Sequence, residues 1–262
     1  MYRFLLSRQW VILTLLALVL IPSMVELGFW QLHRHQHRVA QNELVARNLD
    51  AGAVPVGELT SPGRTVPRAD YWRTVTATGT FDPGHEVVVR RRTNADDRVG
   101  FHVLSPLVLT DGRVVLVNRG WVPAADDQKA FPEVPAPPRG TVTVTGRLKA
   151  DETTGASGIK DLAGLPPRQV MLINSGQQAE LLGREVLGGY LEQTAPASGD
   201  AGPEQIPAPD HGSIGAHMAY AVQWWLFAAA VPLGWVILVR REKRDRTAAS
   251  GQNAPEPVTA AA

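Results

Sequence analysis

Two long apolar stretches, one near each end of the chain, dominate the pattern of hydrophobic and polar positions. They run from Trp10 to Trp30 and from Met218 to Val239. Each has about twenty residues, and at roughly 1.5 Å rise per residue a helix of that length crosses a hydrocarbon core of about 30 Å. The pattern predicts a membrane protein with two transmembrane helices and one polar domain between them.

The predicted domain organisation follows from these two spans. A cytoplasmic N-terminus (1–9) precedes the first span (10–30), and an extracytoplasmic domain (31–216) precedes the second (217–239). The last segment (240–262) is basic at first and, from Arg246 onward, has too little apolar surface to fold. A cleaved signal peptide is the alternative for the first span, but this apolar run is longer than that of a signal peptide and ends in bulky residues.

The distribution of Lys and Arg predicts the orientation, because positively charged loops stay in the cytoplasm. Arg3 and Arg8 precede the first span, against Arg34 and Arg38 after it. A larger basic cluster follows the second span: Arg240, Arg241, Lys243, Arg244 and Arg246. We therefore expect a multi-pass protein of the plasma membrane with both termini in the cytoplasm.

Between the spans, partial alternation of apolar and polar residues, with many Val and Thr, predicts β-strands. The predicted strands are 71–81, 86–91, 100–110, 113–122 and 141–148, with shorter ones at 171–173 and 190–192. Asp111 and Gly112 predict a two-residue type I′ hairpin turn, and Pro106 predicts an edge or bulge position. A helix over 176–182 would begin with Asn174 or Ser175 as N-cap. The fold class is therefore a mostly antiparallel β domain, a small barrel or sandwich with some helix, flanked by two transmembrane helices.

Composition and charge argue against several functions. The chain has no cysteine and 4 methionines, which excludes a Cys-x-x-Cys-His haem attachment, a thiol redox centre and paired thiolates for copper(I). The formal net charge is +1, and the basic residues are juxtamembrane or mixed with acids, so we expect no binding of nucleic acid.

The sequence also has no motif of a common enzyme class. It contains no Gly-x-Ser-x-Gly, no His-Glu-x-x-His and no glycine-rich phosphate loop. His102, Ser105 and Asp111 would form a catalytic set only if the fold brought them together. We therefore expect a protein that is not an enzyme.

The second span begins with an ionisable residue, His217, and such a residue at membrane depth is a functional candidate. On a helix, His217 shares one face with Tyr220, Ala221, Trp224 and Ala228. An imidazole, flat aromatic rings and small gaps are the features that a porphyrin site needs. The alternative is an interfacial histidine that is satisfied by water or by a neighbouring backbone group.

Several short motifs occur in order along the chain. They are LGFWQLHR (27–34), YWRTV (71–75) with GTFD (79–82), GFHV (100–103) with SPL (105–107), VNRGWVP (117–123) and HMAYAVQW (217–224). In their order, their spacing and the two-span topology, the chain resembles the Surfeit locus protein 1 family, as a bacterial member of actinobacterial type. Ser105 departs from the pattern, because the family usually has Thr at this place.

The resemblance implies a function and the residues for it. Members of the family are membrane factors required to assemble cytochrome c oxidase, and they are thought to bind haem a transiently and help deliver it to the catalytic subunit. By this resemblance His217 is the haem ligand, with Tyr220 and Trp224 beside it. The implied partners are the oxidase catalytic subunit and haem a synthase, besides membrane lipid. The family motifs that would face them include Trp30, Gln31, Arg34, Asn118, Arg119, Gly120 and Trp121.

Some candidate residues have plainer interpretations. His33 and His37 share a helical face and His35 lies between them, but a wet juxtamembrane helix is favoured over a metal site, since no carboxylate or thiol is close. Glu26 is expected to be interfacial or paired with Arg34, or to contact a partner helix.

Two further segments have structural interpretations. Arg119 and Trp121 are expected to be scaffold, with Gly120 at a bulge or a close backbone approach. The small residues at 228–230 and Gly234 would let another helix approach, either that of a partner or the first span of this chain.

The sequence therefore predicts a non-catalytic, membrane-anchored assembly factor of cytochrome c oxidase. Two alternatives remain open. One is a permanent structural subunit of an oxidase-containing supercomplex, and the other is a copper carrier that uses the histidines.

Overall fold

The computed structural model of the protein describes residues 3–124, 127, 129–196 and 202–252. The chain divides into two compact units. One consists of Met1–Gln41 with Gly212–Ala262, and the other of Asn42–His211.

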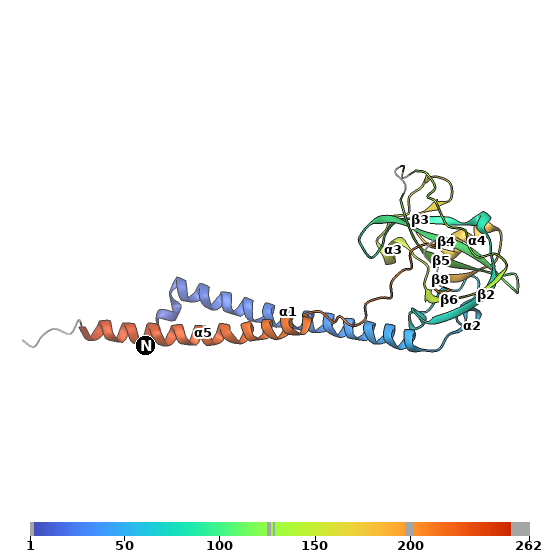
Figure 1. Ribbon diagram of the computed structural model, residues 1–262. Helices are drawn as coiled ribbons and strands as arrows, with labels where there is room; N and C mark the ends of the chain where they lie inside the picture. The colour runs from blue at the N-terminus through green and yellow to red at the C-terminus, as the bar shows by residue number, and fades with distance from the viewer. Residues whose placement is uncertain (1–2, 125–126, 128, 197–201, 253–262) are drawn as a thin grey trace, which may run out of the picture. The chain divides into compact units, whose positions relative to one another are not determined.

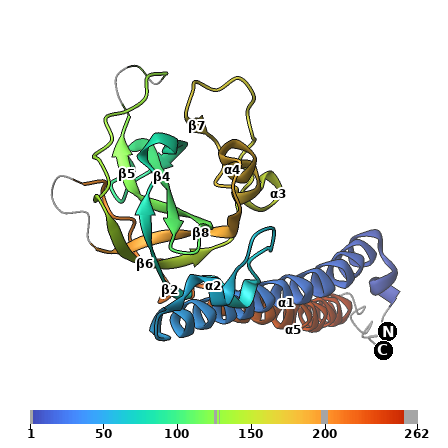
Figure 2. The ribbon, with the colours of Figure 1, turned by 90° about the vertical axis from the view of Figure 1, so that its right-hand side faces the viewer.

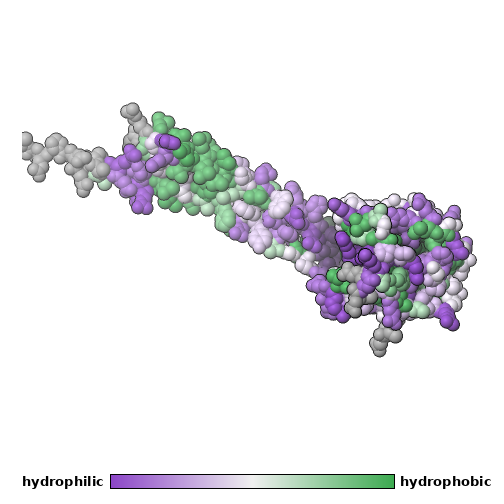
Figure 3. Space-filling model, turned by 90° about the horizontal axis from the view of Figure 1, so that it is seen from above, coloured by the Kyte–Doolittle hydropathy of each residue, from purple (hydrophilic) through white to green (hydrophobic). Residues whose placement is uncertain are grey.

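The first unit is helical. It contains a short 3-10 helix, η1 (Arg3–Leu6), and two long helices, α1 (Arg8–Asp50) and α5 (His217–Gln252), of which the last residues of α1 belong to the second unit. Figures 1 and 2 show α1 and α5 side by side. Both helices are long and apolar enough to cross a membrane. Apolar residues form a broad band on the surface of the helix pair in Figure 3, as expected of helices surrounded by lipid.

The two long helices pack along a regular seam. Buried or half-buried side chains recur at 10, 14, 17, 21, 24, 28 and 31 on α1, and at 217, 221, 224, 228, 231 and 235 on α5. Alternate steps of three and four residues are typical of helices that pack at a small crossing angle. Gly28 leaves room in this seam for an indole, because a Cβ atom there would lie 2.2 Å from Nε1 of Trp225.

Aromatic residues add contacts near both ends of the seam. The rings of Phe29 and Trp225 are 5.6 Å apart, and those of Trp10 and Trp235 are 6.3 Å apart. Trp235 also donates its indole N–H to the Thr14 hydroxyl at 3.2 Å. The small residues of α5 that are buried, Ala221 and Ala228, belong to this seam, so the first span of the chain itself covers them.

The second unit is built on an eight-stranded sheet. Its strands are β1 (Val54–Pro55), β2 (Thr74–Phe81), β3 (Val87–Thr93), β4 (Val99–Leu109), β5 (Val114–Pro123), β6 (Thr141–Lys149), β7 (Gln169–Val170) and β8 (Val186–Ala195). Its helices are α2 (Val56–Leu59), α3 (Thr154–Ser157) and α4 (Ser175–Leu182), with 3-10 turns η2 (Arg68–Asp70) and η3 (Pro83–His85).

Five of the strands close into a barrel. Neighbours follow the order β2-β6-β8-β5-β4, and β4 pairs again with β2, which completes the ring that Figure 2 shows. Within the ring only β5 and β8 are parallel. Small Greek-key barrels such as the OB-fold have this kind of five-stranded ring. Of the two predicted folds, barrel and sandwich, the chain adopts the barrel.

The barrel interior is one apolar cluster to which all five ring strands contribute. Its buried members on these strands are Val75, Ala77, Phe81, Leu107, Val115, Val117, Val144, Leu148, Leu187 and Leu191. Because side chains alternate between the two faces of a strand, their neighbours point outward. A second cluster on the outer face joins Leu116 and Tyr190 of the ring to Val89 of β3 and Ala179 of α4.

The structure confirms the predicted strands except at 171–173, but the short strand predicted at 190–192 is the middle of the ten-residue strand β8. The ends of the others differ by up to three residues. Residues 171–173 are buried but form no strand, and the two-residue strand β7 precedes them. Their backbone groups form hydrogen bonds with side chains instead of with a neighbouring strand. The Met171 carbonyl accepts from Arg92, and the Ile173 N–H donates to Glu152. Helix α4 follows at once, with Asn174 as its N-cap, as predicted.

The hairpin between β4 and β5 is present, but its turn differs from the prediction. The Leu109 N–H donates to the Arg113 carbonyl and the Gly112 N–H to the Leu109 carbonyl, which leaves three loop residues. Gly112 has φ +86°, whereas Asp111 has no positive φ, and a type I′ turn needs one at both positions. The type I′ prediction is wrong because the Asp111 carboxylate bonds to the Arg113 N–H and side chain in another turn conformation.

Pro106 lies where β4 changes its partner. Pairing with β3 extends as far as Leu104, and pairing with β2 begins at Leu107. The absent N–H of Pro106 therefore falls between two ladders, which is equivalent to the predicted edge position.

Strand β5 contains the predicted bulge. The register shifts between Val103 and Leu104 of β4, so that Arg119 is the extra residue of β5. Gly120 has φ +135°, and a Cβ atom there would lie 2.4 Å from the carbonyl oxygen of Glu204. Both features predicted for Gly120, a bulge and a close backbone approach, are confirmed.

The end of α5 corrects the prediction of disorder from Arg246. The helix continues to Gln252, and Glu242 pairs with Arg246 across one turn at 2.7 Å, a spacing that supports a helix. The remainder of that predicted tail, 253–262, lies outside the described residues.

Candidate functional site

His217, the first residue of α5, bonds to a residue of α1. Its Nδ1 lies 2.9 Å from Oε1 of Gln31, and both side chains are half-buried. An amide oxygen can only accept, so Nδ1 has the proton and donates it. In the neutral imidazole this leaves Nε2 with the lone pair, which is the form that coordinates a metal. Sequence reasoning placed both residues in motifs but missed this bond.

The edge of His217 that includes Nε2 faces a glycine. A Cβ atom at Gly215 would lie 3.5 Å from Nε2 and 3.4 Å from Cδ2. Gly215 has φ +66°, a conformation that residues with a side chain rarely adopt. Residue 215 therefore places no side chain against this edge of the imidazole.

The predicted face of α5 divides into two parts. Ala221 and Ala228 lie in the seam with α1, so the small gaps expected between the aromatic rings are already filled. Trp224 is half-buried and packs edge-on against Phe227, with ring centroids 6.1 Å apart. Tyr220 is 50% exposed. Of the predicted site, His217 and Trp224 therefore lie in the seam, and Tyr220 lies outside it.

The end of the first span presents a stacked pair. The guanidinium of Arg34 lies 5.2 Å from the centre of the Trp30 ring, which is a cation–π contact, and Trp30 is 51% exposed. The predicted alternative in which Arg34 pairs with Glu26 is wrong, because the two residues are about two helical turns apart and Arg34 lies over Trp30 instead.

In the barrel, Arg119 of the bulge forms a buried ion pair with Glu86. Its Nη1 lies 2.8 Å from Oε2 of Glu86, and the same oxygen accepts a 2.5 Å bond from the Ser105 hydroxyl. Nη2 of Arg119 donates to the Pro135 carbonyl at 2.8 Å. Burial lowers the pKa of Arg119, and the nearby Glu86 carboxylate opposes this shift. The pair ties β5 to the start of β3, as the scaffold interpretation requires.

The neighbouring Asn118 fixes the tautomer of a second histidine. Its Oδ1 accepts from the Gly120 N–H at 3.2 Å, so its Nδ2 is the atom that faces His102 Nδ1 at 3.1 Å and donates to it. Burial, and then the charges of Arg92 and Lys149, lower the pKa of His102 to about 3. His102 is therefore neutral at physiological pH, with its proton on Nε2.

Trp121 completes this segment. It is 4% exposed, and its indole N–H donates to the Arg92 carbonyl at 3.1 Å. Gly100 makes room for the ring, because a Cβ atom there would lie 2.6 Å from it. The side chains of Asn118, Arg119 and Trp121 are all buried, so as a partner surface this segment is less accessible than Trp30.

Another polar contact of the barrel was not predicted from the sequence. Trp72 has φ +68°, which is rare for a bulky residue, and its ring centre lies 3.3 Å from Nζ of Lys149. Burial lowers the pKa of Lys149, while the charge of Glu192 raises it. Glu192 itself accepts from Arg147 at 3.1 Å. No sequence pattern predicts a left-handed backbone conformation at a tryptophan, so the contact between Trp72 and Lys149 is found only in the folded structure.

The three residues considered as a catalytic set do not come together. Ser105 bonds to Glu86, and Asp111 bonds to Arg113 at the hairpin, while His102 has the bond described above. Within the described part of the chain, no group of three or more His, Asp or Glu side chains is placed to hold a metal ion.

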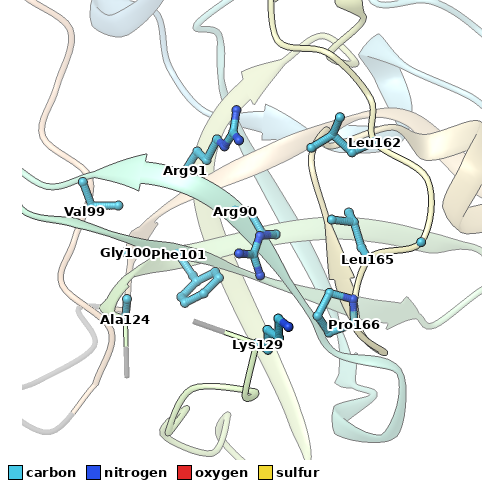
Figure 4. A pocket seen from close by; sticks show the side chains of 11 residues that line it. Arg90, Arg91, Val99, Gly100, Phe101, Ala124, Lys129, Leu162, Leu165 and Pro166 are labelled. Atoms are coloured by element: carbon cyan, nitrogen blue, oxygen red, sulfur yellow. The ribbon is translucent and has the colours of Figure 1, made fainter. Parts of the chain in front are cut away.

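A hollow of about 470 Å³ lies beside β3 and β4, as Figure 4 shows. Arg90 lies near its centre in that view, and Arg91, with φ +56°, and Lys129 also line it. The apolar lining consists of Val99, Phe101, Ala124, Leu162, Leu165 and Pro166. None of the site residues predicted from the sequence lines this hollow.

The family model that matches the chain is described as the SURF1 family, and it covers residues 18–229. That range is most of the chain and includes Gln31, the bulge and His217. The chain belongs to the SURF1 family. This family is known for factors that assemble cytochrome c oxidase.

Similar proteins agree with membership of the SURF1 family. An uncharacterized SURF1-like protein of Mycobacterium tuberculosis (strain ATCC 25618 / H37Rv) is 32% identical over 251 residues, which is 93% of this chain and 88% of the relative. A SURF1-like protein of Monosiga brevicollis is 30% identical over 261 residues, 92% of each chain. One from Rickettsia felis is 27% identical over 108 residues, 41% of this chain and 45% of the relative.

Proposed function

We propose that this member of the SURF1 family is a non-catalytic, membrane-anchored assembly factor of cytochrome c oxidase that assists insertion of haem a into the catalytic subunit. The bond between His217 and Gln31 is the observation that supports the proposal most directly. It leaves Nε2 as the free nitrogen of a half-buried imidazole at the end of a predicted span.

The residues around His217 fit a porphyrin as transient cargo. His217 would supply the axial nitrogen, Gln31 would fix its tautomer, and Tyr220 and Trp224 would offer aromatic surface. Gly215 places no side chain against the Nε2 edge of this imidazole. Since the chain has no cysteine, imidazole is its strongest iron ligand here.

The proposal also includes the compartment and the partners. With both termini in the cytoplasm, the barrel and His217 belong to the extracytoplasmic side of the plasma membrane. The partners are the catalytic subunit of the oxidase and haem a synthase, from which the haem would come.

Deletion of the protein tests the assembly role. We expect less a-type absorbance in the reduced-minus-oxidised spectrum of membranes, while haem synthesis and copper delivery continue. An unchanged a-type band would contradict the proposal. Purification should yield the oxidase in substoichiometric amounts, since a stoichiometric oxidase would indicate a permanent subunit instead.

A His217→Leu variant tests the ligand. Leucine makes the helix more apolar, so membrane insertion should persist, and less haem should co-purify when haem a is produced alongside the protein. A matched control is His211→Leu, at an exposed histidine outside α5. Equal haem spectra for His217→Leu and wild type would show that the ligand assignment is wrong.

A further inference from the structure

One face of α1 within the first span is not covered by α5. It includes Leu15, Val19, Pro22, Glu26 and Trp30, which are all exposed. The seam with α5 lies on the opposite side of the helix. At 3.6 residues per turn, residues two apart, such as Glu26 and Gly28 of the seam, are separated by about 200° around the axis.

Glu26 is an ionisable residue inside an apolar run, one helical turn before Trp30. Among the residues that the structure describes, its carboxyl group has neither an ion pair nor a hydrogen bond. An ionisable side chain inside a membrane span is costly and is normally paired with another polar group. The described chain supplies no donor to this carboxyl group, so it is available to a donor from another molecule.

A second acceptor lies deeper on the same side of the helix. Pro22 has no N–H, so the carbonyl of Leu18 loses its helical donor. Ser23 donates its hydroxyl to the Val19 carbonyl at 2.8 Å and so does not serve Leu18 in this arrangement. In lipid, a donor from a neighbouring helix is one of the ways in which such a carbonyl is satisfied.

We propose that the Glu26 face, defined as Leu15, Val19, Pro22, Glu26 and Trp30, docks against a transmembrane helix of a partner protein that presents hydrogen-bond donors. The face offers a carboxyl group and a backbone carbonyl, so its complement is a helix with Lys, Arg or side-chain hydroxyl and amide groups at the same depth. Interhelical hydrogen bonds are a main source of helix association in membranes, where apolar surfaces gain little by meeting.

The same chemistry disfavours a second copy of this chain as the occupant. In a symmetric pair the same patch meets itself, so two Glu26 carboxyl groups would lie together, where ionised carboxylates repel each other and only a protonated one can donate. The inference is independent of haem binding, because the face lies on the other side of α1 from the seam that joins it to α5.

Photo-cross-linking in native membranes tests the inference on the full chain. A photoreactive residue at Val19 should give an adduct with another membrane protein, and the cross-linked peptide should contain a donor side chain within one turn. The matched control is the same probe at Leu233 of α5, which is 62% exposed and lies off the Glu26 face. Glu26→Leu should reduce the Val19 adduct about tenfold, as loss of an interhelical hydrogen bond predicts, and Glu26→Gln, which keeps an acceptor, should reduce it less.

Each contrary result overturns the inference. These results are an undiminished adduct in Glu26→Leu at equal protein abundance, a cross-linked segment without donors, an adduct between two copies of this chain, or no protein adduct at Val19. An absent Val19 adduct in the otherwise wild-type chain, with normal haem content, would affect this inference alone. Loss of haem in His217→Leu with an intact adduct would affect only the proposed haem site.

Discussion

Nδ1 of His217 lies 2.9 Å from Oε1 of Gln31, a residue 186 positions earlier in the chain. The bond joins the first residue of α5 to the end of the first span and sets the tautomer of the imidazole. A carboxamide behind a histidine is the kind of contact that orients a metal ligand and tunes its basicity.

In the proposed haem site, Gln31→Leu should therefore weaken haem binding about 10- to 100-fold although His217 is still present, the usual effect of losing such a supporting bond. Titration of haem into the purified protein in detergent, followed by absorbance, measures it. Gln36→Leu, at an exposed glutamine of the same helix, is the control and should bind as wild type does. If Gln31→Leu also binds normally, the bond does not position the ligand.

Arg119→Met should destabilise the barrel by about 3 to 5 kcal/mol, because it leaves the Glu86 carboxylate buried without its ion-pair partner. The free energy of unfolding from denaturant titration, followed by tryptophan fluorescence, is the measurement. Adding Glu86→Gln to Arg119→Met should recover part of the loss, since no buried charge then remains. A double variant no more stable than Arg119→Met would contradict the ion-pair argument. Arg113→Met, at an exposed pair, should change little.

His102 should make stability depend on pH in the acidic range. Its pKa is about 3 in the folded protein and returns to the ordinary 6.5 on unfolding, so between these values the unfolded state binds more protons. The free energy of unfolding should fall as the pH falls from about 6.5 towards 3, by at most about 1.4 kcal/mol per pH unit. Above about pH 6.5, titration of His102 should not change the stability.

A His102→Gln variant provides the comparison for this pH effect. Glutamine does not titrate and can still accept from Asn118. Unfolding midpoints at pH 7.5 and pH 5 should therefore differ less in the variant than in wild type. Equal differences in the two proteins would show that other groups dominate the acid response.

The Lys and Arg distribution predicts the result of a topology experiment. A reporter that is active only in the cytoplasm should work when fused after Arg246 and fail when inserted at Gly164, an exposed loop residue of the β-rich unit. Activity in the opposite pattern would reverse the orientation and every statement about the compartment of the barrel.

Several features of this protein could be predicted from the sequence, because they depend only on residues that are close together along the chain. Two apolar runs long enough for a bilayer predict two spans, because length and hydropathy are properties of a segment by itself. Alternation predicted the ring strands, and Asn174 predicted the start of α4, since its cap bonds only to the next turn. Gly120 marked the bulge because few other residues accept its backbone conformation.

Other features depend on residues that meet only in the folded chain. The sequence by itself could name His217 and Gln31 but not join them, and it placed Ala221 on a haem-facing surface although α1 covers it. Closure of the strands into a barrel rather than a sandwich depends on the pairing of β2 with β4, and the buried Glu86 finds Arg119 only across that sheet. Such contacts were decided by tertiary structure, because hydrogen bonds and burial depend on distances in space that the spacing of residues along the chain does not specify.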